Sequence, residues 1–250
     1  MNVIKPILVL VFVFFGVTFQ VKAQTEHWII NTLEWPPYTC SRCAENGAAA
    51  KALRDSLKTV GVEVEFVFYT WSQTIKKAAE PKVFGYFPMW YDTLKPGFIR
   101  SPALFSSPIG IIQQRKKPLV WNNLSDLKGK KIGVTQDYNY SEEFNRLVKS
   151  GAIKVETAIS DDINLTRVAS GELDGAMTDI NNARYFLFNS SAEVFTKVEV
   201  NPKILETKEL FIGINEKSAG KIDKLKQALK NVNYQRLVDE YLLRYQRRVE

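Results

Sequence analysis

The sequence of 250 residues contains little cysteine, proline and glycine, and a single histidine. It has 2 Cys, 10 Pro, 13 Gly and 1 His. So few cysteines exclude a disulfide-rich scaffold, and so little glycine and proline excludes a collagen-like or low-complexity chain. Two thiols and one imidazole fall short of the about four ligands that a zinc site uses. With 45% hydrophobic residues, the sequence predicts a globular protein without a bound metal.

Motifs of nucleotide-binding and hydrolytic enzymes are also absent. The sequence has no G-x-G-x-x-G, no G-x-x-x-x-G-K-[ST] and no G-x-S-x-G. His27 stands at the very start of the first expected strand, so we expect it at the surface. The sequence therefore predicts no cofactor and no catalytic residue. Asp92, Asp137 and Asp179 could meet in a cleft, which leaves a lyase open as an alternative.

The N-terminus is typical of an export signal. Lys5 gives it a positive start, residues 7–17 form an uncharged apolar run, and a small residue, Ala23, ends it. The run is shorter than the ~20 residues that span a bilayer, so a retained anchor is the less favoured alternative. No cysteine follows closely enough to carry a lipid. We expect residues 1–23 to be a cleaved signal peptide, and the mature chain to be periplasmic.

The positive charge does not indicate nucleic-acid binding. The net charge is +7, and loss of Lys5 and Lys22 with the signal lowers it to +5. The remaining basic residues lie in short runs that are flanked by polar or acidic residues. Such runs are typical of solvated surface, and an exported protein rarely meets nucleic acid.

The two cysteines form one Cys-Ser-Arg-Cys motif, Cys40 to Cys43, in a polar loop. A thioredoxin-like redox pair would stand at the start of a helix, but Pro36 and Pro37 precede this one and Gly47 separates it from the next helical spacing. A redox role stays open as an alternative. In an oxidising compartment a structural disulfide is the default, and it would close a short loop.

Hydrophobic periodicity predicts an α/β protein built from two similar sets of elements. The first set comprises strands over 27–33, 62–69 and 83–89 and helices over 48–60 and 71–79. The second comprises strands over 131–135, 153–157 and 173–178 and helices over 141–149, 161–170 and 180–187, with an extended segment over 192–200. A strand over 210–214 and helices over 222–231 and 234–245 end the chain.

The closing strand and helices suit completion of the first set rather than extension of the second. We therefore predict a discontinuous first lobe, residues 24–112 and 210–250, and a second lobe, residues 113–209. The chain would cross between them near residues 111–115 and 209–211. Two crossovers make a hinge, and ligands of such proteins bind in the cleft between the lobes.

Four stretches in order resemble the periplasmic solute-binding proteins of family 3, the polar amino-acid type with the type II periplasmic binding fold. They are Glu-Trp-Pro-Pro-Tyr at 34–38, Val-Glu-Phe-Val at 64–67 with Thr-Trp at 70–71, Asp-Leu-Lys-Gly-Lys-Lys-Ile-Gly-Val at 126–134, and Gly-Glu-Leu-Asp-Gly-Ala-Met-Thr-Asp at 171–179. The resemblance implies a monomeric receptor that closes on a small polar solute for ABC-type uptake through an inner-membrane permease.

The same resemblance implies roles for three residues. Tyr38 would stack on the ligand, Asp179 would bind its ammonium group, and Ser141 would bind an anion at a helix start. Asp179 and Ser141 also suit plain helix capping, and both alternatives stay open. A periplasmic sensor or partner subunit uncoupled from transport, and a lyase of the cyclohexadienyl dehydratase kind, are the alternative functions.

One departure from the family bears on the ligand. The family's carboxylate-clamping arginine falls on Thr93 here, and no arginine occurs between Arg54 and Arg100. Lys95 could supply a point charge, but it cannot reproduce a bidentate fork. A ligand without an α-carboxylate is therefore expected.

Aromatic residues are enriched instead where the cleft is expected. Eight such residues stand at strand ends or in loops: Trp35, Tyr38, Trp71, Phe87, Trp90, Tyr91, Tyr138 and Tyr140. Core packing is the alternative role for Phe87 and Trp35, whereas Tyr and Trp at such positions can stack on a flat ring or a cation. The predicted ligand-binding residues are Tyr38, Trp71, Trp90, Tyr91, Tyr140, Ser141 and Asp179.

Overall fold

A computed structural model describes residues 25–246, so the predicted signal peptide lies outside the described part. The strands are β1 (Glu26–Leu33), β2 (Val62–Tyr69), β3 (Val83–Trp90), β4 (Phe98–Arg100), β5 (Phe105–Gln114), β6 (Lys131–Thr135), β7 (Lys154–Ala158), β8 (Gly175–Asp179) and β9 (Val198–Asn215). The helices are α1 (Ala48–Lys58), α2 (Trp71–Ala78), α3 (Glu142–Lys149), α4 (Asp161–Ser170), α5 (Ile180–Phe188), α6 (Ala192–Lys197), α7 (Ile222–Leu229) and α8 (Tyr234–Gln246).

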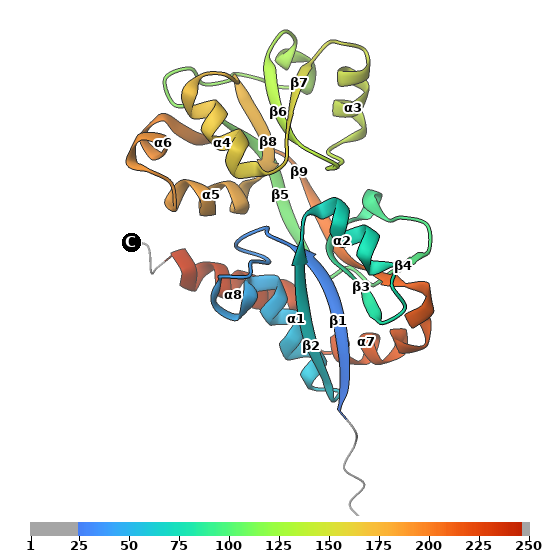
Figure 1. The fold of residues 1–250 in the computed structure, drawn as a ribbon. Coiled ribbons are helices and arrows are strands. Elements are labelled where there is room, and N and C mark those ends of the chain that lie inside the picture. Colours follow the sequence, from blue (N-terminus) through green and yellow to red (C-terminus); the bar gives the residue numbers. More distant parts are fainter. Residues whose placement is uncertain (1–24, 247–250) are drawn as a thin grey trace, which may run out of the picture.

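The elements form two lobes joined by two strands (Figure 1). In one lobe, β2, β1 and β3 pair in parallel and carry α1, α2, α7 and α8; in the other, β7, β6 and β8 pair in parallel and carry α3 to α6. The strand order is β2-β1-β3-β9-β5-β8-β6-β7, with β4 paired to β9. The expected α/β architecture with two lobes is confirmed.

Both crossings are antiparallel strands that run from one lobe into the other. β9 pairs with β3 and β4 near its end and with β5 along most of its earlier length, while β5 also pairs with β8. The predicted strand over 210–214 is therefore only the last part of an 18-residue strand. The predicted lobe borders at 112/113 and 209/210 fall inside β5 and β9, and they stay a prediction.

The first lobe packs its sheet tightly around two glycines. β3 is buried along its whole length, as expected of a central strand covered on both faces. A Cβ atom on Gly85 would lie 2.2 Å from the Gly213 carbonyl oxygen, and one on Gly213 would lie 2.3 Å from the Tyr86 ring. Only glycine allows this close approach between β3 and β9.

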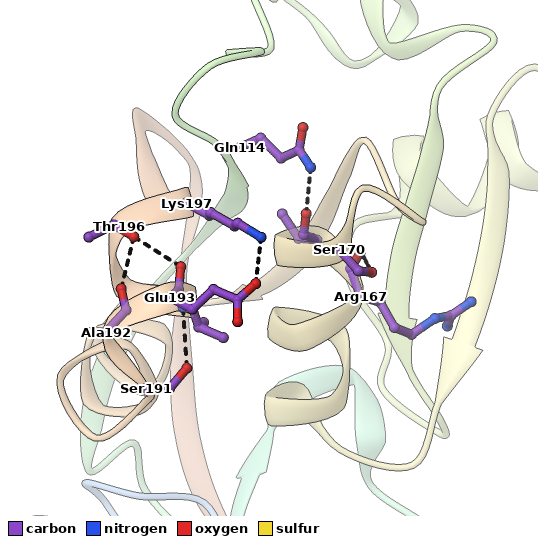
Figure 2. Close-up of polar contacts among 10 residues, drawn as sticks. Gln114, Arg167, Ser170, Ser191, Ala192, Glu193, Thr196 and Lys197 are labelled. Atoms are coloured by element: carbon purple, nitrogen blue, oxygen red, sulfur yellow. Dashed lines mark hydrogen bonds and ion pairs between the residues drawn. The ribbon is translucent and has the colours of Figure 1, made fainter.

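One predicted element is wrong. The segment over 192–200, expected to be extended, begins with the helix α6. The Ser191 hydroxyl accepts a hydrogen bond from the Val194 N–H, and the Thr196 hydroxyl donates to the Ala192 carbonyl (Figure 2). The Lys197 ammonium lies 2.6 Å from the Glu193 carboxylate one turn away. These local contacts favour a helix that the alternating apolar residues conceal.

Candidate functional site

A pocket with aromatic walls lies where the two lobes meet. Its nine lining residues are Leu33, Trp35, Trp71, Pro88, Met89, Trp90, Thr93, Tyr138 and Leu210. The empty volume is about 300 Å³, including space open to solvent. The carboxyl ends of β1 and β3 supply most of the wall, and Tyr138 follows β6 in the other lobe. This is the usual position of a ligand in an α/β protein.

The Trp90 ring in this wall contacts two other aromatic rings edge to face. The Trp35 and Trp90 ring centroids are 6.1 Å apart, and the Trp90 and Tyr138 centroids are 5.2 Å apart. Trp35 and Trp90 are 4% and 6% exposed. Because Tyr138 and Trp90 come from different lobes, their contact depends on lobe closure.

Thr93, the position at which the resemblance leads us to expect a carboxylate-clamping arginine, lines the pocket. Its hydroxyl donates a hydrogen bond to the Trp90 carbonyl at 2.8 Å, so it fixes the turn after β3. Lys95, the alternative cation, is exposed and does not line the pocket. In the described structure, none of the nine lining residues carries a positive charge.

A loop of the first lobe reaches across to helix α5. We call residues 35–47 the clasp loop. The Asn182 Nδ2 atom donates to the Pro36 carbonyl at 2.5 Å, and the Asn181 Nδ2 atom donates to the Tyr38 hydroxyl at 2.8 Å. The Tyr38 hydroxyl in turn donates to Asp179 Oδ2 at 3.4 Å. The clasp loop therefore closes one side of the space between the lobes.

A disulfide joins Cys40 and Cys43 within the clasp loop, as predicted. The Cys43 sulfur lies 3.7 Å from the Tyr185 hydroxyl on α5, so the disulfide itself contacts the other lobe. Gly47 ends the loop with a φ of 97°, and a Cβ there would meet the Tyr38 carbonyl oxygen at 2.6 Å. Glycine at this position lets the loop pack against the start of α1.

A buried ammonium group connects the lobes on the hinge side. Lys208 of β9 lies 3.1 Å from the Asp92 carboxylate and 3.7 Å from that of Glu206. It also donates to the Asn139 carbonyl of the second lobe at 2.8 Å. Its Nζ lies 5.0 Å from the centroid of the Trp90 ring. Lys208 thus stands just behind the pocket wall with its charge already paired.

Two carboxyl groups are buried in the second lobe, and one of them, Asp179, contacts Tyr38 of the clasp loop. Burial raises the pKa of Asp179 to about 7, although the Asn182 N–H bonded to it acts in the opposite direction. Burial also raises the pKa of Asp161 to about 6, against a hydrogen bond from the Thr135 hydroxyl. Burial raises the pKa of the Tyr138 hydroxyl, and the negative charges of Asp161 and Asp179 raise it further. In residues 25–246 we find no group of three or more His, Cys, Asp or Glu arranged to hold a metal.

Comparison with known proteins identifies the architecture. Neither a protein-family model nor a curated protein sequence matches the chain. Among solved structures, an ancestral arginine-binding protein bound to arginine is similar with a TM-score of 0.72 and 18% identity, over 87% of this chain and 99% of that one. A histidine kinase sensor domain with similarity to periplasmic binding proteins has a TM-score of 0.72 and 15% identity, over 88% and 97%. The chain therefore has the type II periplasmic binding protein fold.

A third similar structure is a ligand-binding core. The GluR0 ligand-binding core from Nostoc punctiforme, in complex with L-glutamate, has a TM-score of 0.65 and 21% identity, over 86% of this chain and 98% of that one. These three similarities show the binding protein fold. Their sequence identities are too low to assign the ligand of any of these proteins to this chain. All three structures are binding or sensor domains rather than enzymes.

Within this fold, the predicted ligand residues fall into separate groups. Trp71 and Trp90 line the pocket. Tyr38 and Asp179 are buried and bonded to each other. Tyr140 is buried in the second lobe, where its hydroxyl accepts from the Thr135 N–H and donates to the Met177 carbonyl. The structure thus brings only part of the predicted set to the pocket.

The remaining two predicted residues lie apart from the pocket wall. Tyr91 is 60% exposed, with the Arg100 guanidinium 3.6 Å from its ring centroid. The Ser141 hydroxyl accepts from the Phe144 N–H and caps α3. Asp179 likewise caps α5 through the Asn182 N–H. Their ligand-binding roles remain predictions.

Several residues that the prediction missed connect the lobes. Asn181 and Asn182 lie two and three residues after the strand-ending Asp179, in the first turn of the following helix, and that position was the available signal. Nothing in the sequence indicated that Lys208 would be buried between the lobes, because an isolated lysine in a strand is commonly exposed to solvent. Its burial depends on β9 passing between Asp92 and Asn139, which are distant in sequence.

Proposed function

We propose that the chain is a periplasmic receptor that closes its two lobes on a small polar solute with an apolar or aromatic portion. The observation that carries the proposal is the pocket wall, which combines three tryptophans of the first lobe with Tyr138 of the second. A solute that contacts both sides would favour the closed arrangement, because it binds that state more tightly.

The electrostatics favour a solute that is neutral or positively charged. Asp92 and Glu206 outnumber the single ammonium of Lys208 behind Trp90. Asp137, next to Tyr138, accepts a hydrogen bond from Ser72 of the other lobe. The similar arginine-binding protein is consistent with a cationic solute, and the missing arginine clamp favours one without an α-carboxylate.

The proposal includes secretion through the signal peptide of residues 1–23 and delivery of the solute to an inner-membrane ABC permease. Each helix within residues 25–246 is too short or too polar to span a bilayer. Similarity to a histidine kinase sensor domain supports a second candidate, a sensor subunit uncoupled from uptake. Permease genes beside the gene of this protein would favour transport over sensing.

A lyase of the cyclohexadienyl dehydratase kind is the third candidate. The nine lining residues include no histidine and no carboxylate, so the described pocket offers only the hydroxyls of Thr93 and Tyr138 for proton transfer. We therefore favour a binding function over a catalytic one. Turnover of cyclic acids by the purified protein would favour the lyase instead.

A thermal-shift screen tests the receptor proposal. Amino acids, polyamines, small peptides and aromatic solutes are added to the protein, and a solute bound only by the folded state raises its melting temperature. Calorimetric affinities of the hit are then measured for Trp71→Ala and Tyr138→Ala. Each is expected to weaken binding at least about tenfold, since each removes aromatic contact from one side of the pocket.

Phe188→Ala serves as the matched control for those variants. Phe188 is an aromatic residue on α5 that is 45% exposed and contacts Phe195 rather than the pocket. Its loss should leave the affinity unchanged. If the hit binds equally well to Trp71→Ala and Tyr138→Ala, the solute lies elsewhere and the receptor proposal for this pocket is wrong.

A further inference from the structure

We propose that the solute carries a positively charged group, of the ammonium or guanidinium class, and that the Asp137 carboxylate binds this group at the mouth of the pocket. The inference rests on the proposed function, because it names the chemical class of solute for the same pocket. It narrows that class to a cation with an apolar or aromatic body.

The mouth of the pocket lies at Trp71 and Tyr138. Of the nine lining residues, these two are partly exposed to solvent and the other seven are buried. Trp71 belongs to the first lobe and Tyr138 to the second. A solute that enters the pocket from solvent therefore meets these two side chains first.

Ser72 and Asp137 join the two lobes beside this mouth. Ser72 follows Trp71 in the first turn of α2, and Asp137 precedes Tyr138 in the turn after β6. The Ser72 hydroxyl donates a hydrogen bond to the Asp137 carboxylate, although 65 residues separate the two in the sequence. Both residues are exposed, so the carboxylate is accessible from solvent next to the side chains that line the mouth.

The backbone of Asp137 is in the left-handed region, with a φ of 62°. Apart from glycine, few residues adopt this conformation, and Asn and Asp tolerate it best. Residues held in such conformations cluster at ligand-binding and switch sites, because the surrounding structure has to stabilise them. The turn at Asp137 thus presents a carboxylate toward the other lobe at a modest cost in backbone strain.

The negative charge of Asp137 is not neutralised by another residue. In residues 25–246 the Asp137 carboxylate bonds to the Ser72 hydroxyl and makes no ion pair. The Lys208 ammonium, on the hinge side of the pocket, is paired with Asp92 and Glu206. A hydroxyl donor leaves the full charge of a carboxylate in place, so a solute cation at the mouth gains an attraction that a neutral solute does not.

The aromatic rings at the mouth also favour a cation, because the faces of Trp and Tyr rings attract ammonium and guanidinium groups. The buried part of the wall, by contrast, is apolar at Leu33, Met89 and Leu210, and its lining residues carry no charge. Burying a charge there would be strongly unfavourable. The charged group of the solute therefore stays at the mouth, and its apolar body occupies the interior.

Three small aromatic compounds provide the test, because they share a ring and differ in charge. Benzylammonium is a cation at pH 7, benzyl alcohol is neutral and benzoate is an anion. Each is titrated into the ¹⁵N-labelled protein, and a dissociation constant is fitted to the shifts of the backbone amide resonances. Benzylammonium should bind about tenfold more tightly than benzyl alcohol, since only the cation is attracted by the carboxylate and the ring faces. Benzoate should bind more weakly than both.

Asp137→Asn separates the charge of the site from its shape. Asparagine tolerates the same left-handed conformation and still offers an oxygen to the Ser72 hydroxyl. The variant should bind benzylammonium about fivefold more weakly and benzyl alcohol with unchanged affinity.

Asp174→Asn is the matched control for this variant. Asp174 is exposed in the same lobe, but its carboxylate accepts from the Lys131 N–H at the opposite end of β6 from the pocket. The affinities of Asp174→Asn should equal those of the wild type. Thermal melts establish that both variants are folded.

Three results would overturn the inference: no saturable binding of benzylammonium, equal affinities for benzylammonium and benzyl alcohol, or a benzylammonium affinity that Asp137→Asn lowers no more than Asp174→Asn. Its failure differs from failure of the receptor proposal. Equal binding of the cation and the alcohol that is lost in Trp71→Ala and Tyr138→Ala would leave the receptor standing and remove the cation site. Absence of any screen hit together with no binding of the three compounds would remove both.

Discussion

The Asn182 side-chain amide donates a hydrogen bond to the Pro36 carbonyl, although 146 residues separate the two in the sequence. Pro36 belongs to the clasp loop of the first lobe, and Asn182 lies in the first turn of α5 in the second (Figure 1). Tyr38 and Asn181 form a parallel contact beside it. The protein therefore closes one side of its cleft with its own polar groups.

Asn182→Ala should shift the protein toward an open arrangement of the lobes. The change removes the donor to Pro36, while Asp179 still caps α5 through the backbone N–H of residue 182. We expect a larger radius of gyration in small-angle X-ray scattering. Asn145→Ala is the control, because the Asn145 side-chain amide donates to Asn139 within its own lobe. An unchanged radius for Asn182→Ala would show that this contact does not hold the lobes together.

Loss of the disulfide should have a modest effect on global stability. The bond between Cys40 and Cys43 closes a very short loop, for which chain entropy predicts a stabilisation of about 2 kcal/mol. Denaturant unfolding of the Cys40→Ser, Cys43→Ser variant should show a loss of that order. Reductant should reproduce the loss in the wild type and have no effect on the variant. A loss several times larger would mean that the disulfide also holds the buried Trp35 and Tyr38 of the clasp loop in the core.

Asp179 should make the protein less stable as the pH rises. Its pKa is raised to about 7 by burial, so between pH about 4 and 7 the folded state keeps a proton that the unfolded state has lost. The free energy of unfolding then falls through that window and levels off above it, by about 4 kcal/mol at most. Asp161, with a pKa of about 6, adds a fall of the same sign.

Asp179→Asn isolates this effect, because asparagine keeps the size of the side chain and can still cap α5. The variant should be more stable than the wild type at pH 8, and the two should converge toward pH 4. Melting temperatures across this range measure the difference. Asp126→Asn is the control of opposite sign, since hydrogen bonds from the Asn122 and Asn123 N–H groups lower the pKa of Asp126. A pH profile unaltered by Asp179→Asn would contradict the assignment.

Lys208 should be energetically coupled to Asp92. In a double-mutant cycle, Lys208→Met and Asp92→Asn are measured singly and together by denaturant unfolding. We expect a coupling of about 1 kcal/mol, because Asp92 is partly exposed and its charge is screened. In the control cycle, Lys203→Met replaces Lys208→Met. Lys203 also lies over a tryptophan, Trp121, but these two residues belong to the same lobe. A coupling near zero would mean that Lys208 contributes through Glu206 and the Asn139 carbonyl rather than through Asp92.

The sequence predicts the regular elements well where a local pattern determines them. The strands over 62–69 and 131–135 and the helix over 161–170 have the predicted bounds, since alternation or helical spacing and a following glycine mark them. The helix over 192–197 is wrong in the prediction, because its stability comes from a serine cap and one ion pair rather than from an apolar face.

The site was predictable only as a set of residue types. The tryptophans at the start of α2 and at the end of β3 do line a pocket, as their positions next to strand ends suggest. The bond between Tyr38 and Asp179 was not predictable, because it depends on how two distant loops meet when the lobes close. Tyr91 shows the converse, since one residue beyond Trp90 the chain turns and the ring points to solvent beside Arg100.

The continuous strand β9 has a consequence for unfolding. Its main chain is paired to β3 and β4 in one lobe and, through β5, to β8 in the other, so both lobes share one ladder of backbone hydrogen bonds. Neither lobe can unfold without breaking backbone hydrogen bonds of β9 or β5, and these strands also belong to the sheet of the other lobe. We therefore expect one cooperative unfolding transition, with amide protons along β9 among the last to exchange.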